Sequence, residues 1–257
     1  MDLGLRGKVV VVTGGTEGIG RATALKLAQE GAKVAICARG AALLEKTADE
    51  IRKAGGEVLA VAADMSKTAD IARFINAVTA RFGRLDILVN NAGTSARGKF
   101  LEVDDATWSA DLELKLFGAI RCTRLAVPHM KQQGSGRIIN ITISSAKQPG
   151  AGSMPTSVSR AAGLALTKAL SKEFAADNIL VNTICIGKIK SGQHERRYTR
   201  EGLGADQYYS QMAKDIPLGR FGEAEEVANV IAFLASEAAS YVTGSSINLD
   251  GGISGVL

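Results

Sequence analysis

Cysteine and histidine are scarce in this 257-residue chain, and their scarcity bears on two kinds of site. The three cysteines, Cys37, Cys122 and Cys185, lie far apart, form no Cys-x-x-Cys pair and are odd in number. That pattern argues against a disulfide framework. A closed zinc site draws on several Cys and His ligands, and the chain has only two histidines. We therefore expect neither a disulfide network nor a metal site.

Long hydrophobic stretches are also missing. No apolar run approaches the roughly 20 residues needed to cross a bilayer, and residues 1–6 lack the apolar core of a secretory signal. Apolar residues make up 46% and charged residues 22% of the chain, as in globular rather than disordered proteins. These features predict a cytoplasmic protein without a membrane partner. The length favours one domain over residues 1–257.

A basic stripe interleaved with aromatic residues, as single-strand nucleic-acid binders use, is absent although the net charge is +5. Residues 1–200 hold 29 Lys and Arg against 18 Asp and Glu, mostly as single basic residues on predicted helices. The one basic cluster comprises Lys188, Lys190, Arg196, Arg197 and Arg200. We expect no nucleic-acid partner, and we interpret the cluster as a hint of an anionic substrate or an acidic carrier.

What the chain does contain is a regular alternation of strands and helices. Short runs rich in Val and Ile are separated by segments of helical period, which is typical of a parallel sheet with helices on both faces. The predicted strands are Val9–Val12, Val34–Ile36, Val58–Val61, Ile87–Val89, Arg137–Ile143, Leu180–Cys185 and Ser246–Leu249. The predicted helices are Arg21–Glu30, Leu43–Lys53, Ile71–Phe82, Trp108–Met130, Ser157–Ala176 and Glu225–Leu234. We predict an α/β protein, a single doubly wound Rossmann-type domain with a seven-stranded, mostly parallel sheet.

Two segments interrupt this alternation. Residues 95–105 form a short polar loop, whereas residues 188–217 are a long charged segment that contains Tyr198, Tyr208 and Tyr209. Long loops inside compact α/β domains often cover binding sites. We therefore interpret residues 188–217 as a substrate lid.

A glycine-rich turn follows the first predicted strand. Residues 13–20 read Thr-Gly-Gly-Thr-Glu-Gly-Ile-Gly and lead directly into a helix. Glycine at Gly14, Gly18 and Gly20 lets the backbone turn tightly and approach a pyrophosphate without Cβ clashes. The helix N-terminus then offers free N–H groups to the anion. This pattern, placed between the first strand and the first helix, predicts a dinucleotide site.

These residues resemble the short-chain dehydrogenase/reductase family, whose glycine motif has the form T-G-x-x-x-G-x-G. Residues 90–93, Asn-Asn-Ala-Gly, end the fourth strand as the family's N-N-A-G does, and residues 218–223, 243–244 and 250–252 match its C-terminal pattern. The resemblance implies an NAD(P)(H)-dependent oxidoreductase that transfers hydride between the nicotinamide and a small-molecule carbonyl or alcohol. It also implies a homotetramer or a homodimer.

The resemblance assigns a cofactor site as well. The expected cofactor-binding residues are Gly14, Thr16, Gly18, Ile19, Gly20, Arg39, Asp64, Met65, Asn90, Ala92, Gly93, Arg160, Gly187, Ile189 and Ser191.

The end of the second strand bears on cofactor preference. Ala38 stands where NAD-preferring relatives carry Asp, and Arg39 can pair with a 2′-phosphate. Glu17 stands where phosphate-preferring relatives often carry a basic residue, and it could neutralise Arg39 or repel the phosphate. We favour NADP(H), with NAD(H) as the alternative.

All four usual catalytic positions of the family are substituted. Thr156 and Arg160 stand for the tyrosine and lysine of Y-x-x-x-K, and Lys115 stands for the asparagine of the preceding helix. An ungapped count puts Ile143 at the serine position, with Ser144 one residue away and within reach of a local bulge. Since no tyrosine precedes Tyr198, no shift in register restores one.

The candidate catalytic set is therefore Lys115, Ser144, Thr156 and Arg160. An aliphatic alcohol has a pKa far above the ~10 of tyrosine, so Thr156 is a poor proton donor. Arg160 stays protonated but can hold a ribose or stabilise an anion. A buried Lys115 would have a lowered pKa and could serve as acid or base, unless it extends to solvent.

Two hypotheses about function follow. In the first, which we favour, the chain is an oxidoreductase in which Lys115, Ser144 or a lid tyrosine protonates the substrate oxygen. In the second, the loss of all four coupled residues marks a catalytically silent protein that binds NADP(H) or regulates a partner. The sequence does not identify the substrate.

Overall fold

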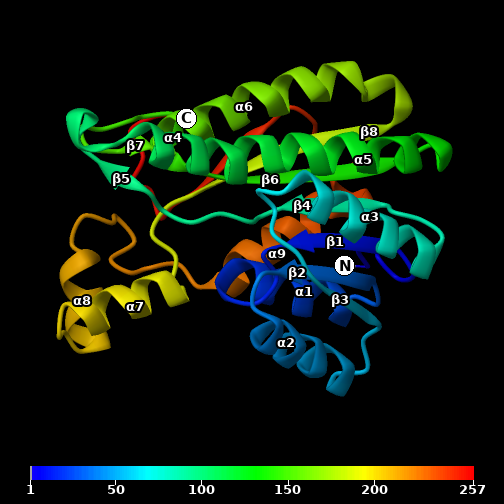
Figure 1. Cartoon of the computed structure of the whole chain (residues 1–257), viewed down its shortest axis with the longest axis horizontal. Coiled ribbons are helices and arrows are strands. Elements are labelled where there is room, and N and C mark those ends of the chain that lie inside the picture. The colour runs from blue at the N-terminus through cyan, green and yellow to red at the C-terminus, as the bar shows by residue number, and fades with distance from the viewer. Residues whose placement is uncertain (1) are drawn as a thin grey trace.

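The structure, a computed structural model, describes residues 2–257 and contains a seven-stranded sheet (Figure 1). Its order is β3-β2-β1-β4-β6-β8-β9, and every neighbouring pair is parallel. The strands are β1 (Val9–Thr13), β2 (Lys33–Ala38), β3 (Val58–Ala62), β4 (Ile87–Asn90), β6 (Gly136–Ile143), β8 (Ile179–Ile186) and β9 (Ser246–Leu249). The predicted doubly wound α/β fold is confirmed.

Strand β1 shows why the apolar runs form the middle of the sheet. Its valines are fully buried, and they alternate between two separate cores: Val10 and Val12 lie in one, Val9 and Val11 in the other. Side chains of successive strand residues point to opposite faces. A strand covered on both faces therefore needs a continuous apolar run rather than an alternating one.

Helices cover both faces (Figure 1). One core is closed by α1 (Gly18–Gln29), α2 (Ala41–Lys53) and α9 (Ala224–Ala235). The opposite core is closed by α3 (Thr68–Phe82), α5 (Gly118–Gln132) and the C-terminal part of α6 (Thr156–Glu173). Within the described residues no helix is both long and apolar enough to cross a membrane.

The helix predicted at Trp108–Met130 is interrupted. It consists of α4 (Asp105–Leu112), a π-helical turn η2 (Glu113–Phe117) and α5. Asp104 caps the start of α4 by accepting a hydrogen bond from the Thr107 N–H at 2.8 Å. Single π-helical turns occur mostly inside α-helices and often at functional sites.

The segment 188–217 is not a loop, because it contains α7 (Gly192–Arg200) and α8 (Ala205–Met212). These two helices, yellow to orange in Figure 1, stand at one end of the sheet. A two-stranded antiparallel pair, β5 (Arg97–Gly98) and β7 (Met154–Pro155), was also not predicted. Strands of two residues are too short to leave a periodic pattern.

Candidate active site

The glycine turn, the end of β4 and the end of β6 lie along one edge of the sheet. Because all the strands of the main sheet are parallel, their carboxyl ends meet there. In open α/β sheets ligands bind at this edge, where the strand order reverses. Here the reversal lies between β1 and β4, since β2 and β3 flank β1 on its other side.

Three positions of the glycine turn leave no room for a side chain or disfavour one: Gly14, Gly18 and Gly20. Gly14 and Gly18 have φ angles of +69° and +49°, in the region that L residues rarely adopt. A Cβ on Gly20 would lie 2.0 Å from the carbonyl oxygen of Gly14. Helix α1 begins at Gly18, so the free N–H groups of its first turn face this edge.

Residues that directly follow β4 hold the glycine turn in place by hydrogen bonds. The Asn91 side-chain nitrogen donates to the carbonyls of Thr13 and Gly14 at 2.9 and 3.1 Å. The Thr13 hydroxyl in turn accepts from the N–H groups of Asn91 and Ala92, both at 3.0 Å. Asn91 was not among the expected site residues, because its role depends on a contact across the sheet.

The sequence left open whether Glu17 neutralises Arg39. Its carboxylate pairs with Arg196 of α7 at 3.1 Å, and within residues 2–257 it makes no ion pair with Arg39. A Cβ on Gly18 would lie 3.3 Å from the Cβ of Ser191, so the start of α7 runs beside the glycine turn. Arg39 is exposed at the end of β2 and has no hydrogen-bond partner in the described chain.

The expected cofactor residues Asp64, Met65 and Asn90 have different environments. Asp64 accepts hydrogen bonds from the N–H and hydroxyl of Ser66, at 2.9 and 2.8 Å. The Met65 side chain is buried in the core rather than turned to the edge. The Asn90 side-chain nitrogen donates to Asn140 at 2.9 Å, which joins β4 to β6.

The remaining expected cofactor residues belong to the chain after β8. A Cβ on Gly187 would lie 2.6 Å from Asp250, so this glycine permits close approach to the C-terminal segment. Ile189 is buried and forms a bridge with Gly222.

Two further expected cofactor residues belong to the glycine turn. Ile19 is buried, and Thr16 is contacted by Thr47 of α2.

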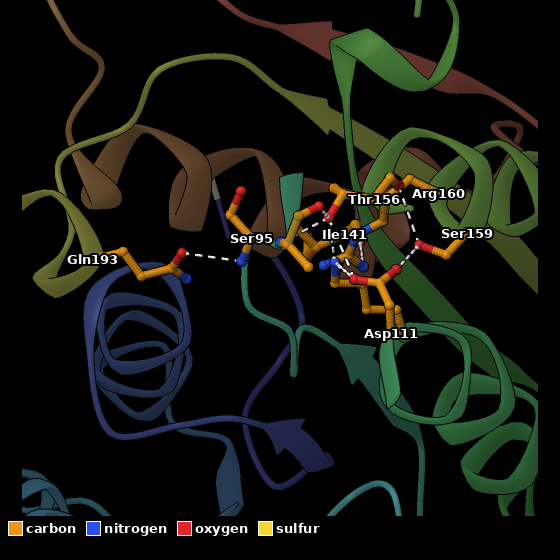
Figure 2. A network of polar contacts seen from close by, with 9 residues as sticks. Ser95, Asp111, Ile141, Thr156, Ser159, Arg160 and Gln193 are labelled. Atoms are coloured by element: carbon orange, nitrogen blue, oxygen red, sulfur yellow. Dashed lines mark hydrogen bonds and ion pairs between the residues drawn. The ribbon is translucent and has the colours of Figure 1, made fainter. Parts of the chain in front are cut away.

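Lys115 lies in the π-helical turn and points inward, not to solvent. Its side chain is 1% exposed and forms an ion pair with Asp111, which is 2% exposed. The Lys115 ammonium also donates to the Thr156 hydroxyl at 2.6 Å. Asp111 accepts a further hydrogen bond of 2.5 Å from the Ser159 hydroxyl, so α4 and α6 are joined through a buried polar network (Figure 2).

The Thr156 hydroxyl has no capacity left for a substrate. It accepts from Lys115 and from the N–H of Ala96 at 3.0 Å, and it lies 2.7 Å from the Ala96 carbonyl, to which it can donate. A hydroxyl offers one proton and two lone pairs. Thr156 is therefore a support for Lys115 and for the chain at Ala96.

Arg160 completes the group from α6. Its Nη1 donates to the carbonyl of Ile141 at 2.7 Å, whereas its buried Nε has no partner among residues 2–257. A Cβ on Gly93 would lie 2.3 Å from Nη2 of Arg160 and 3.6 Å from Cγ of Lys115. Glycine at position 93 therefore leaves room for the Arg160 guanidinium, whereas Lys115 would meet a side chain there only at ordinary contact distance.

Burial changes the acid strength of both cations. Burial lowers the pKa of Lys115 to about 8; the Asp111 hydrogen bond opposes this effect, and the charges of Arg160 and Arg97 add to it. Burial also lowers the pKa of Arg160 to about 10. At neutral pH both side chains are thus charged, and Lys115 can release a proton within the ordinary pH range.

Ser144 is not joined to this network. It begins the short 3₁₀ turn Ser144–Ala146 after β6, and its hydroxyl makes no hydrogen bond in the described residues. The structure therefore brings Lys115, Thr156 and Arg160 together and leaves Ser144 apart. Two residues that the sequence argument missed, Asp111 and Ser159, are part of the network. The spacing of Asp111 four residues before Lys115 was the signal available for an ion pair.

The tyrosines of residues 188–217 hold that segment together. Tyr208 is 2% exposed, and its hydroxyl lies 2.9 Å from Nδ1 of His194. Its ring packs against Tyr198 and Tyr209 at centroid distances of 5.7 and 5.5 Å. These aromatic contacts form a small core between α7 and α8.

The basic cluster of the same segment has partners of its own. Arg196 pairs with Glu17, Arg197 with Glu201 and Lys190 with Glu223. Lys188 donates to the carbonyl of Met212 at 2.7 Å. Acidic residues thus offset three of these charges, two of them from distant parts of the chain, and an anionic substrate stays a prediction.

Comparisons with known proteins agree with this geometry. A family profile described as "Enoyl-(Acyl carrier protein) reductase" matches residues 14–254. A curated "3-oxoacyl-[acyl-carrier-protein] reductase FabG" of Staphylococcus epidermidis is 35% identical over 247 residues, which cover 96% of this chain and 98% of that protein.

Two solved structures are similar over almost their whole length. The L-sorbose reductase of Gluconobacter frateurii, in complex with NADPH and L-sorbose, is 36% identical with a TM-score of 0.95 and full coverage of both chains. An NADPH-bound short chain oxidoreductase of Pseudomonas aeruginosa PAO1, described as containing an atypical catalytic center, is 36% identical with a TM-score of 0.91. That match covers 97% of this chain and 98% of the other.

Proposed function

The chain belongs to the short-chain dehydrogenase/reductase family, and from this premise we propose an NADP(H)-dependent oxidoreductase in which Lys115 replaces the usual proton donor. The observation that carries the proposal is the placement of the Lys115 ammonium. The ammonium is buried against Asp111 and Thr156, the lysine stem lies near Gly93 at the carboxyl ends of the strands, and the pKa of Lys115 is lowered to about 8.

The residues present fit a dinucleotide phosphate. The turn from Gly14 to Gly20 leaves open backbone and a helix N-terminus for a pyrophosphate. Arg39 is exposed and unpaired among the described residues, so its guanidinium is free to bind a 2′-phosphate. Glu17, the nearby acid that would oppose such binding, is paired with Arg196. Two similar proteins were solved with NADPH, which supports the preference for NADP(H) over NAD(H).

When bound, NADPH would supply the hydride for the carbonyl carbon, and the carbonyl oxygen would then need a proton. Lys115 has three N–H groups, of which Asp111 and Thr156 take two. The third is the proton that we assign to the substrate oxygen. Lys115 becomes a neutral amine in this step and is recharged from water. Arg160 keeps its charge and stabilises the developing anion.

The substrate that we propose is a small-molecule carbonyl or alcohol. The relatives named above act on 3-oxoacyl groups and on L-sorbose, so the shared chemistry is a ketone. Helices α7 and α8 form the cover over this edge in our proposal. Gln193 of α7 accepts from the N–H of Ser95 at 3.3 Å (Figure 2). Arg196 of the same helix pairs with Glu17 of the glycine turn.

The test has two stages. NADPH binding is measured by fluorescence, and its oxidation is then followed against a panel that contains 3-oxoacyl thioesters, L-sorbose and simple ketones. We expect turnover of at least one ketone, lowered by about 10²- to 10⁴-fold in Lys115→Met and by much less in Thr156→Ala. Failure of both NADPH and NADH to bind at millimolar concentration would overturn the proposal.

One observation favours the second candidate, a catalytically silent NADP(H)-binding protein. Two acceptors hold Lys115, and the Thr156 hydroxyl has no free proton or lone pair. The polar groups of the site are thus mostly hydrogen-bonded to one another rather than open to a substrate. Tight NADPH binding without oxidation by any member of the panel would support that function and reject the first.

We further propose that the chain forms a homotetramer or homodimer through the face of α5 and α6. Phe117 and Val158 are 41% and 46% exposed there. Light scattering of the purified protein gives the mass directly. A monomer that stays monomeric at millimolar concentration would contradict this assignment.

A further inference from the structure

Asp111 is the one carboxylate in the network around Lys115. It lies on α4, one helical turn before Lys115, and its side chain is 2% exposed. One carboxylate oxygen accepts from the Lys115 ammonium and lies 3.3 Å from the Thr156 hydroxyl. The other accepts from the Ser159 hydroxyl at 2.5 Å. Both oxygens are therefore occupied by fixed donors, as Figure 2 shows for Ser159.

The charges that face Lys115 are otherwise positive. Arg160 faces it from α6 and Arg97 from β5, and both disfavour its charged form. An ammonium ion with so little exposure and two neighbouring cations needs a buried anion to stay charged. Asp111 is the acid that meets this need within the described residues, because no other carboxylate acts on Lys115.

The network also fixes where the ammonium sits. A lysine side chain has four rotatable bonds and a point charge with three donors. Asp111 and Thr156 hold two of these donors from α4 and α6. Ser159, itself on α6, holds the carboxylate in place. Of the three N–H groups of Lys115, one is thus left without an acceptor among residues 2–257.

We propose that Asp111 is the positioning residue of the reaction site, which keeps the Lys115 ammonium charged and in place while Ser159 fixes Asp111. This role rests on the proposed function, because it gives Lys115 the part of proton donor. Asp111 acts through Lys115 in this proposal and has no part of its own in the proton transfer.

The direct test measures the ionisation of Lys115 without any turnover. The protein is labelled with [ε-¹³C]lysine, and the Lys115 resonance is identified by its absence in Lys115→Met. In the wild type it should titrate near pH 8. In Asp111→Asn the midpoint should fall by about one pH unit or more, because a nearby opposite charge is removed. An unchanged midpoint in Asp111→Asn would overturn the proposal.

The matched control is Asp105→Asn. Asp105 lies on the same helix, one and a half turns earlier, but it is exposed and outside the network. Its replacement removes the same charge from α4, and the Lys115 midpoint should stay where it is. A shift as large as that of Asp111→Asn would mean that helix charge alone, and not the hydrogen-bonded pair, sets the ionisation of Lys115.

A pH profile tests the catalytic consequence. The donor is the charged form, so kcat/KM for ketone reduction should be constant below about pH 8 and fall tenfold per pH unit above it. In Asp111→Asn this falling limb should move to lower pH together with the NMR midpoint. If the wild type reduces no ketone, the proposed function fails, and the NMR titration still decides the role of Asp111.

Asp111→Asn could fail to fold, because it leaves a buried ammonium without its anion. In that case Asp111→Asn/Lys115→Met should fold, since the second change removes the uncompensated charge. Thermal unfolding followed by circular dichroism decides this. A double variant that remains unfolded would show that Asp111 supports the fold independently of Lys115, and the proposal would be wrong.

Discussion

The glycine turn and the group around Lys115 lie at the same end of the sheet, but one relies on backbone atoms and the other on side chains. The turn from Gly14 to Gly20 offers its backbone to a ligand, and at Gly14, Gly18 and Gly20 it requires the absence of a side chain. The neighbouring group of Lys115, Asp111 and Thr156 is made of side chains held by one another. A backbone site can change little, because each Cβ meets a fixed atom. A side-chain site can be replaced as a set, provided that charge and hydrogen bonds balance again.

The strongest way to separate the glycine turn from the Lys115 group is to remove the proton donor. Lys115→Met should lower kcat by about 10²- to 10⁴-fold, the usual contribution of a positioned acid. The affinity for NADPH should change by less than about threefold, because this side chain is not among the expected cofactor contacts. Stopped-flow reduction and fluorescence titration measure the two quantities. A parallel loss of NADPH affinity would show that the two form one site.

The converse change is made in the glycine turn. Gly20→Ala places a methyl group 2.0 Å from the Gly14 carbonyl, where only movement of the backbone could admit it. We expect NADPH affinity to fall by about 100-fold and Tm to drop by several degrees. Gly40→Ala is the control, since a Cβ there meets nothing within 4 Å. Equal behaviour of the two variants would contradict the steric account of the turn.

A smaller effect should appear at the adenosine end. Arg39→Ala should weaken NADPH binding by about ten- to a hundredfold, the worth of a charge-assisted hydrogen bond. NADH binding should be unchanged, since NADH lacks the 2′-phosphate. Competition titrations with both dinucleotides provide the measurement. If both weaken equally, Arg39 serves the turn in general and does not select the phosphate.

The smallest effect should come from the contact between α7 and the turn. Arg196→Gln breaks the pair with Glu17, which is exposed on both sides. Exposed ion pairs contribute about 0–1 kcal/mol, so we expect NADPH affinity to fall by less than about fivefold. Arg200→Gln is the control on the same helix. A loss comparable to that of Arg39→Ala would move the 2′-phosphate contact from β2 to α7.

The seven strands and the glycine turn could be predicted from sequence because their causes are local. Val9 to Val12 must be apolar if both faces are buried, and Gly14 must be glycine if its φ is positive. The turn could be located from eight consecutive residues. The same holds for α3, whose helical period extends over most of its length.

The reaction site could be predicted only in part, because its contacts are not local. The sequence left open whether Lys115 points inward or to solvent. It points inward, and its partners are Asp111 on α4 and Thr156 on α6. The sequence does not reveal the π-helical turn that carries Lys115, because the residues of Glu113–Phe117 are ordinary helix formers. Counting put Ile143 at the serine position, and Ser144 was included because a bulge could bring it in. Such a count does not show which way a residue points after a strand ends.

The π-helical turn between α4 and α5 has a consequence for how such a chain can diverge. A π-helical turn contains about one residue more than an α-helical turn, so the register of α4 is uncoupled from that of α5. Cys122, Ala126 and Met130 of α5 stay packed in the core, whatever α4 presents to the reaction site. The long helix therefore consists of two packing units. One unit is held constant by the core, and the other is free to exchange its polar residues in concert with α6.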